Sequence, residues 1–299
     1  MDAETAKNAE RWTIRRVLQA SADYLERQGS PTARLDAEVL LAHALSTDRV
    51  GLYVNLEQPL LESELAPYRE LLRRRAAREP VAYLTGRKEF FGLSFKVARG
   101  VLIPRPDTEI LVEAVLANTQ ECTAGVFLEV GVGSGAIALS VLKKRPRLQA
   151  VGVDVSGAAL EVSRENAAAL GLSDRIELRR GDLFGAVKDG EKFDLLLSNP
   201  PYIRSSGISE LEPEIRDYEP REALDGGADG FSVIRVLIGE AGKYLRGGGL
   251  LAIELGEDQS EEAFALAEKA GVWENIEIRQ DLAGLDRVLL ARRKSQVEA

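Results

Sequence analysis

The second half of the chain alternates short apolar runs with segments of helical periodicity, and this alternation limits the fold more than any other feature. Strands are expected at VFLEV, LQAVGVDV, RIELRRG, FDLLLSN, GLLAIEL, NIEIRQD and RVLLARR. The segments AIALSVLKKR, GAALEVSRENAAALG and FSVIRVLIGEAGKYL between them have helical spacing. Such a pattern is typical of a parallel sheet with helices on both faces. The sequence therefore predicts an α/β fold with seven strands, mostly parallel and with the last strand antiparallel.

The first part of the chain lacks this alternation and is expected to be helical. TIRRVLQASADYLERQG, ARLDAEVLLAHAL and ESELAPYRELLRRRAARE each have amphipathic spacing, and Ser30-Pro31 is expected to begin the second of these helices. GRKEFFGLSFKVARGVLIP alternates apolar and polar residues around glycines, which indicates a hairpin. The expected organisation is a helical bundle over residues 1–85, a β-hairpin linker over 86–103 and the sheet domain over 104–299. Asp107 or Thr108 is expected to cap the helix TEILVEAVLAN.

Composition excludes several classes of protein. The 299 residues suggest about two domains, and the formal net charge of -9 disfavours non-specific binding to a phosphate backbone. The single cysteine, Cys122, permits no internal disulfide, and with a single histidine the chain cannot supply a Cys/His zinc site. The N-terminus lacks the apolar core of a signal peptide, and no apolar run approaches the length of a membrane span. A cytoplasmic protein without a metal centre is therefore expected.

A glycine-rich turn follows the first predicted strand of the sheet domain. Its residues are Gly131, Val132, Gly133, Ser134 and Gly135. Asp154 ends the second strand, where a carboxylate can accept hydrogen bonds from both hydroxyls of a ribose. Asp182 and Leu183 follow the third strand and can meet the amino edge and the face of an adenine. Three strand ends that suit adenosine, with G-x-G-x-G rather than G-x-G-x-x-G spacing, favour S-adenosylmethionine over NAD.

Asn199-Pro200-Pro201-Tyr202 follows the fourth predicted strand and forms a rigid corner there. A proline restricts the residue before it to extended conformations, so Asn199 and Pro200 are both restrained. The Asn199 side-chain oxygen and the Pro200 carbonyl can then accept the two hydrogens of a planar NH2 group. Tyr202 offers a flat face for stacking. An amide or exocyclic amine is a weak nucleophile, and fixed geometry contributes most to such a reaction.

Several segments together resemble the HemK-type protein-(glutamine-N5) methyltransferases, which modify the glutamine of the Gly-Gly-Gln motif in peptide chain release factors. The matching segments are REPVAYLTG, EFFG, IPRPDTE, the glycine-rich turn and NPPY. The resemblance extends from about Leu35 to Arg287 and implies a helical N-terminal domain, a hairpin and a Rossmann-like methyltransferase domain. Glu129 departs slightly, since the family often has aspartate there. Tyr218–Leu224 also matches and is expected to support the substrate side.

The resemblance also assigns roles to individual residues. Residues implied to bind S-adenosylmethionine are Gly131, Val132, Gly133, Ser134, Gly135, Asp154, Asp182, Leu183, Asn199, Arg105 and Thr108. Of these, Arg105 and Thr108 are implied to close over the cofactor. The NPPY residues Asn199, Pro200, Pro201 and Tyr202 are implied to bind the substrate, with Asn199, Pro200 and Tyr202 in catalysis.

Three alternatives to release factor methylation stay open on the sequence alone. The enzyme could methylate a glutamine of a ribosomal protein, or the N6 amino group of adenine in nucleic acid, which is also planar. The arginines of the third helix, Arg69, Arg73, Arg74, Arg75 and Arg78, are the one feature that favours nucleic acid, although such a cluster is more often a solvated helix face. A non-enzymatic adenosine-binding module is disfavoured by the intact NPPY. We expect a protein substrate, no direct contact with nucleic acid or membrane, and a monomer.

Overall fold

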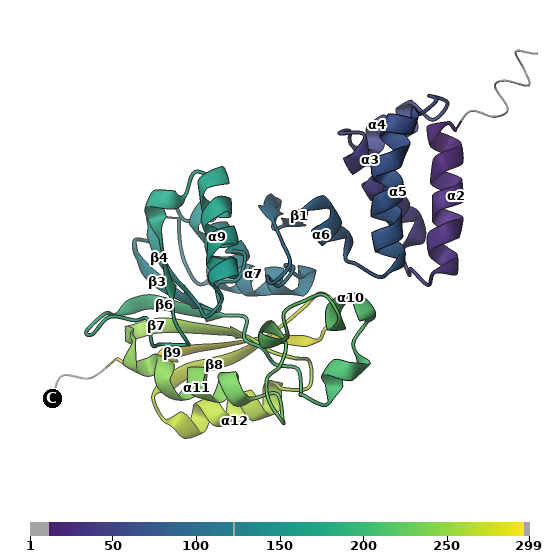
Figure 1. The fold of residues 1–299 in the computed structure, drawn as a ribbon. Coiled ribbons are helices and arrows are strands. Elements are labelled where there is room, and N and C mark those ends of the chain that lie inside the picture. The colour runs from purple at the N-terminus through teal and green to yellow at the C-terminus, as the bar shows by residue number, and fades with distance from the viewer. Residues whose placement is uncertain (1–11, 122, 296–299) are drawn as a thin grey trace, which may run out of the picture. The chain divides into compact units, whose positions relative to one another are not determined.

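The computed structural model describes residues 12–121 and 123–295, so Cys122 and the start of the chain lie outside the described residues. The chain forms two compact units. The first contains the described residues up to Gly86 together with Pro213–Tyr218, and the second contains the rest. Among the described helices, none is both long and apolar enough to cross a membrane. Figure 1 shows the elements of each unit.

The first unit is a small helical bundle. Its helices are α2 (Ile14–Arg27), α3 (Ala33–Ala44), α4 (Arg49–Val54), α5 (Glu62–Ala76), α6 (Val81–Thr85) and α10 (Pro213–Arg216). Fully buried Leu18, Leu25, Leu40 and Leu41 from α2 and α3 pack with Tyr68 of α5 in its core. The three long helices were predicted, whereas the short helices α4 and α6 were not.

The expected start of α3 was wrong. This helix begins at Ala33 with Thr32 at its N-cap, and Pro31 lies in the preceding turn rather than at the first helical position. The Ser30 hydroxyl donates instead to Asp36 Oδ2 at 2.6 Å. The Ser30 side chain, which was expected to cap α3, is therefore hydrogen-bonded to the buried carboxylate of Asp36 within the helix.

The arginine cluster of the first unit is paired with acidic side chains. The pairs are Arg69–Glu62, Arg73–Glu70, Arg74–Glu79, Arg75–Asp36, Arg75–Glu214 and Arg78–Glu214. The Arg75 side chain is only 4% exposed and lies 2.7 Å from Asp36 and 2.9 Å from Glu214. A buried charge of this kind is tolerated only when it is paired. The expected solvated face holds for Arg69 and Arg73, whose side chains are 54% and 70% exposed, whereas Arg75 and Arg78 are largely buried within the first unit.

The second unit begins with the predicted hairpin and contains one large sheet. The hairpin strands are β1 (Arg87–Phe90) and β2 (Leu93–Lys96). The sheet strands are β3 (Gly125–Val130), β4 (Leu148–Asp154), β5 (Ile176–Arg180), β6 (Phe193–Ser198), β7 (Leu245–Glu254), β8 (Trp273–Gln280) and β9 (Asp286–Arg293). Their order is β5-β4-β3-β6-β7-β9-β8, and β9 runs antiparallel to the other six strands. The predicted seven-stranded α/β fold is confirmed.

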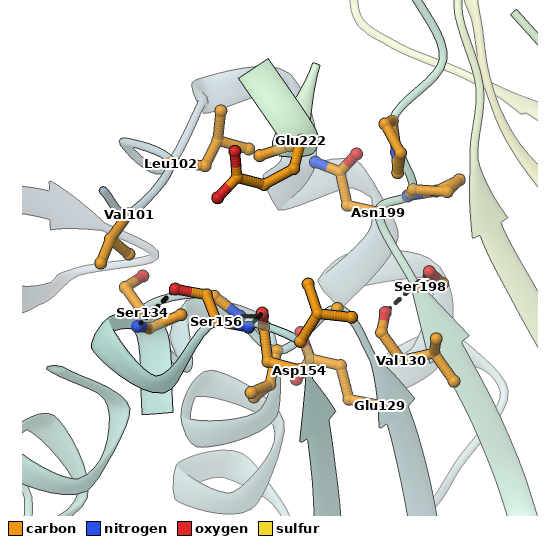
Figure 2. Close-up of a pocket in the computed structure, with 18 of the residues that line it drawn as sticks. Val101, Leu102, Glu129, Val130, Ser134, Asp154, Ser156, Ser198, Asn199 and Glu222 are labelled. Atoms are coloured by element: carbon orange, nitrogen blue, oxygen red, sulfur yellow. Dashed lines mark hydrogen bonds between the residues drawn. The ribbon is translucent and has the colours of Figure 1, made fainter. Parts of the chain in front are cut away.

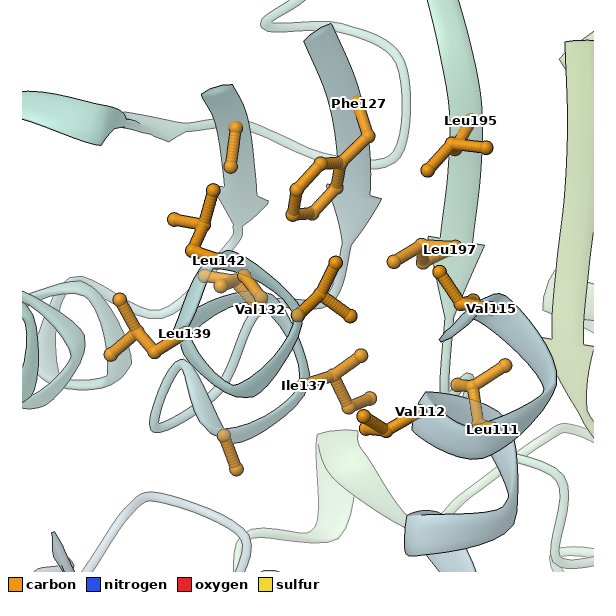
Figure 3. Packing of buried hydrophobic residues seen from close by; sticks show 14 of the residues in the cluster. Leu111, Val112, Val115, Phe127, Val132, Ile137, Leu139, Leu142, Leu195 and Leu197 are labelled. Carbon is orange, nitrogen blue, oxygen red and sulfur yellow. The ribbon is translucent and has the colours of Figure 1, made fainter. Parts of the chain in front are cut away.

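Helices cover both faces of this sheet, because successive residues of the central strands point to opposite sides. The helices are α7 (Glu109–Ala117), α8 (Ala136–Lys144), α9 (Gly157–Ala169), α11 (Ser232–Glu240) and α12 (Ser260–Ala270). Phe127, Leu195 and Leu197 pack against α7 and α8 on one face, as Figure 3 shows. Leu128 and Leu196 pack against α11 and α12 on the other face.

The strand order creates the site. The chain passes from β3 to β4 on one side of β3 and returns to the other side with β6. All three strands are parallel, so their carboxyl ends lie at one edge of the sheet. The connections leave this edge in opposite directions at β3, which is where open α/β sheets bind their ligands.

Candidate active site

A cavity of about 190 Å³ lies at this edge, entirely within the second unit. Figure 2 shows Glu129, Asp154 and Ser156 on the side of the strand ends, with Leu102, Asn199 and Glu222 across the space from them. Other lining residues come from the glycine-rich turn, from 181–183 and from the loop before α7. Of the predicted cofactor residues, all but Gly135 line this one cavity.

Gly135 lies in the helix start rather than in the cavity wall, and two constraints require glycine there. Its φ is +81°, a conformation that L side chains rarely adopt. A Cβ at this position would also lie 2.6 Å from Ser163 Oγ and 3.0 Å from Leu139 Cδ1. Gly131 and Gly133 have positive φ as well, but a Cβ at Gly131 would meet only the Asn199 carbonyl oxygen at 3.9 Å, and one at Gly133 would meet nothing within 4 Å. These two glycines thus leave room beside the cavity, whereas Gly135 permits α8 to pack.

Asp154 is held by backbone donors on both of its oxygens. Gly133 N donates to Oδ2 at 2.8 Å and Ser156 N donates to Oδ1 at 2.9 Å. Burial raises the pKa of this carboxyl, and these two hydrogen bonds oppose the rise. Each oxygen keeps lone-pair capacity for a further donor. The carboxylate is therefore fixed in orientation and can accept two more hydrogen bonds.

The segment after β5 presents both of its expected side chains to the cavity. Asp182 and Leu183 line the cavity, and Leu183 has the unusual φ of +48° for a branched residue. Phe184, which could have supplied an apolar face, is buried on Tyr244 instead, with the two ring centroids 4.4 Å apart. Leu183 therefore offers the apolar surface beside Asp182.

At the corner after β6, Asn199, Pro200 and Pro201 line the cavity, whereas Tyr202 is not among its lining residues. Ser198 precedes them and donates its hydroxyl to the Val130 carbonyl at 2.8 Å, which ties β6 to β3 where both strands end. The Tyr202 hydroxyl lies 3.4 Å from Glu254 Oε1, and burial raises the pKa of this phenol. The expected stacking role of Tyr202 stays a prediction.

The loop before α7 is attached to the site through two side chains. Arg105 pairs with Glu219 at 2.5 Å, and Glu219 also accepts from the Ile103 backbone N at 3.2 Å. Thr108 was expected as a possible helix cap, but its hydroxyl makes no capping bond. It accepts instead from Asn199 Nδ2 at 3.1 Å. The loop is thereby joined to the corner after β6.

Comparison with known proteins decides the family. Residues 16–86 match the PrmC N-terminal domain and residues 106–211 match the methyltransferase small domain. The release factor glutamine methyltransferase of Geobacter sulfurreducens is 45% identical over 94% of this chain and 97% of its own length. The enzyme of the same name from Moorella thermoacetica is 43% identical over 95% of this chain and 100% of its own length. The enzyme from Rhodopirellula baltica is 40% identical over 96% of this chain and 98% of its own length.

The chain belongs to the release factor glutamine methyltransferase family. Among solved structures, a methyltransferase from Pyrococcus furiosus superimposes with a TM-score of 0.50 at 18% identity, covering 76% of this chain and 98% of the other. At that identity the likeness confirms the methyltransferase fold of the second unit. The resemblance found in the sequence is confirmed over nearly the whole chain.

Three acids of this methyltransferase were not among the site residues predicted from the sequence, although Glu129 and the segment that contains Glu222 were noted as family positions. Glu129 is 1% exposed, and its Oε2 accepts from Ala138 N at 2.8 Å, so it satisfies an amide at the start of α8. Glu222 lines the cavity opposite Asp154, and its charge raises the pKa of Asp154. Glu254 is buried at the end of β7. Glu129 and Glu254 lie at or next to the ends of predicted strands, which is the sequence signal that could have identified them. Their contacts, however, depend on residues far away in the sequence.

Replacement of Gly135 by alanine should destabilise the second unit by more than a left-handed φ alone explains. Gly190→Ala is the matched control, because Gly190 has a φ of +79° with nothing within 4 Å of an added Cβ. We expect Gly190→Ala to lower the free energy of unfolding by about 1–2 kcal/mol. Gly135→Ala should cost about 1–3 kcal/mol more because of overpacking. Urea unfolding of the full chain measures both, and equal losses would contradict the packing role.

Proposed function

We propose that this protein transfers a methyl group from S-adenosylmethionine to the side-chain nitrogen of the glutamine in the Gly-Gly-Gln motif of peptide chain release factors. Family membership supports the reaction class. The observation that carries the proposal is that Asn199 and Pro200 line the same cavity as Asp154 and the glycine-rich turn. A pair of acceptors for a planar amide thus lies beside a site that suits an adenosine.

The residues at the three strand ends fit S-adenosylmethionine. Asp154 can accept from both ribose hydroxyls, because the hydrogen bonds from Gly133 N and Ser156 N leave lone-pair capacity on each of its oxygens. Asp182 and Leu183 suit the amino edge and the face of adenine, and Gly131 and Gly133 permit close approach to the backbone. When bound, the cofactor supplies an electrophilic methyl group on a sulfonium.

The corner at Asn199 then orients the substrate amide. The side-chain oxygen of Asn199 and the carbonyl of Pro200 each accept one hydrogen of the glutamine NH2, so its nitrogen is aimed into the cavity. Positioning of this kind can lower the activation barrier by about 7–11 kcal/mol, because the two reactants are already held in the geometry of attack. A strong base is unnecessary before attack, since the amide nitrogen becomes acidic only as its bond to the methyl carbon forms, and the proton that it then loses can pass to solvent.

The structure removes one argument for a nucleic-acid substrate. Each arginine of the cluster on α5 and after it is paired with an acid of the first unit, and Arg75 is buried. The cluster therefore does not form a row of unpaired positive charges among the described residues, and the net charge of the chain is -9. We therefore propose a protein substrate, without direct contact to nucleic acid. We also propose that the enzyme is a monomer and meets its substrate in the cytoplasm.

Asp154→Ala should weaken cofactor binding. Loss of an acceptor for two ribose hydroxyls should raise the Kd for S-adenosylhomocysteine roughly 10–100-fold, as expected for hydrogen bonds to a charged group. Calorimetry measures this, with Asp189→Ala on an exposed loop as control. Unchanged affinity in Asp154→Ala would mean that the ribose binds elsewhere.

Asn199→Ala should separate chemistry from cofactor binding. The variant loses one of the two acceptors that orient the amide, and misplacement of a weak nucleophile should lower kcat roughly a hundredfold or more. Affinity for S-adenosylhomocysteine should change little, because the glycine-rich turn and Asp154 remain. Near-normal turnover would remove Asn199 from the mechanism.

Transfer of a labelled methyl group tests the substrate. Purified protein is offered, in separate tubes, a release factor with Gly-Gly-Gln, its Gln→Ala variant, a ribosomal protein fraction and DNA. Label in the release factor but not in its variant is the expected result. Label confined to the ribosomal fraction would keep the glutamine chemistry and change the partner, and label in DNA would establish an adenine substrate instead.

A further inference from the structure

Glu219 is a buried acid that the reaction described above does not use. Its side chain is only 1% exposed, and each of its two oxygens has a donor in the loop before α7. Arg105 Nη2 donates to Oε1 at 2.5 Å, and Ile103 N donates to Oε2 at 3.2 Å. All three residues belong to the second unit. Because a buried carboxylate is costly unless it is paired, these two bonds hold the acid and the loop together.

The two segments that Glu219 joins both belong to the wall of the cavity. Leu102 and Arg105 line it from the loop before α7, and Pro220 and Glu222 line it from the segment that follows Glu219. Figure 2 shows Leu102 and Glu222 on the same side of the cavity. Arg105 and Glu219 lie 114 residues apart in the sequence. Glu219 itself does not line the cavity, so it can affect a bound ligand only through its neighbours.

The strand order indicates which part of the cofactor would lie near this loop. Asp182 follows β5 and suits the adenine, and Asp154 ends the neighbouring β4 and suits the ribose. The next strands are β3 and β6, so the methionine part is expected beside the glycine-rich turn and Asn199. The Thr108 hydroxyl accepts from Asn199 Nδ2 at 3.1 Å, so the loop before α7 reaches this end of the cavity. Arg105 precedes Thr108 by one short turn and lines the cavity there.

Charge identifies the group that Arg105 would meet. Among the described residues that line the cavity, Arg105 is the only basic one. The carboxylate of its methionine part is the only anionic group of S-adenosylmethionine. A guanidinium has several N–H donors in a planar fork, and the only side-chain hydrogen bond of Arg105 among the described residues is the one to Glu219. The unused donors match the geometry of a carboxylate.

We propose that Glu219 is a positioning residue, which holds the Arg105 guanidinium at the cavity so that its remaining N–H donors bind the carboxylate of the cofactor's methionine part. The inference rests on the proposed function, because it concerns the cofactor which that function requires. A free arginine side chain has many rotamers, and fixing one of them during binding costs conformational entropy. The ion pair with Glu219 fixes the side chain before the cofactor arrives, which favours binding.

An ion pair that only anchors the loop would behave differently. Its loss would disturb the cavity wall and weaken every ligand of the cavity alike. Action through Arg105 predicts instead that only ligands with the methionine carboxylate are affected. S-adenosylhomocysteine carries this carboxylate, and its decarboxylated analogue lacks this group alone. The pair of ligands therefore distinguishes the two roles.

Calorimetry on the full chain measures the Kd of both ligands. We expect Glu219→Gln to raise the Kd for S-adenosylhomocysteine about tenfold, as for the loss of one hydrogen bond to a charged group. The Kd for the decarboxylated analogue should not change. Glu210→Gln, at an exposed acid of the same stretch of chain, is the matched control and should leave both values unchanged. Equal weakening of both ligands, or an unchanged Kd for S-adenosylhomocysteine, would overturn the proposal.

A double-mutant cycle tests whether Glu219 acts through Arg105. Arg105→Ala should weaken S-adenosylhomocysteine at least as much as Glu219→Gln does. Adding Glu219→Gln to Arg105→Ala should cause no further loss, because the acid then has no guanidinium to hold. Losses that simply add would show two independent effects and contradict the proposal.

Glu219→Asp covers the case in which Glu219→Gln does not fold. It keeps the negative charge, but its shorter side chain cannot hold Arg105 in the same place. We expect the Kd for S-adenosylhomocysteine to rise severalfold and that for the decarboxylated analogue to stay the same, and an unchanged ratio of the two would overturn the proposal. None of these measurements needs a methyl acceptor. Failure of the wild type to bind S-adenosylhomocysteine would refute the cofactor itself, whereas normal binding that ignores Glu219 would refute this inference alone.

Discussion

Parallel pairing of β3 with both β4 and β6 is the constraint on which the rest of the site depends. It brings the carboxyl ends of three strands to one edge, so the glycine-rich turn, Asp154 and Asn199 meet although they are far apart in the sequence. The Ser198 hydroxyl fixes the register at that edge through the Val130 carbonyl. A shift of one residue in β6 would reverse its faces and place Asn199 away from the cavity.

Much of this arrangement could be predicted from the sequence because it depends on local signals. Apolar runs marked the strands, and polar residues directly after them marked the cavity edge. Asp154 and Asn199 were found in this way. Short helices such as α4 escaped prediction because one turn and a half carries little periodicity. The start of α3 was misplaced because a tertiary contact of Ser30 with Asp36 outweighed the local preference for capping.

The parts that could not be predicted are those in which one side chain serves a partner far along the chain. Thr108 has the sequence context of a helix cap, yet its hydroxyl accepts a hydrogen bond from Asn199 Nδ2 instead. Glu254 ends an apolar strand and could as well have faced solvent. Phe184 follows Asp182 closely but turns into the core. In each case the outcome depends on packing between elements, which periodicity does not encode.

The Pro213–Tyr218 segment gives the first unit an unusual connectivity. Its Glu214 supplies an acid to the buried Arg75 and to Arg78, although the chain on both sides of the segment belongs to the second unit. No single cut in the polypeptide can therefore release the helical bundle in complete form. A fragment ending at Gly86 would lack Glu214, so Arg75 would keep only Asp36 of its two acidic partners and Arg78 would lose its pairing with Glu214. The first unit is therefore complete only in a chain that also contains the residues of the second unit between Gly86 and Pro213.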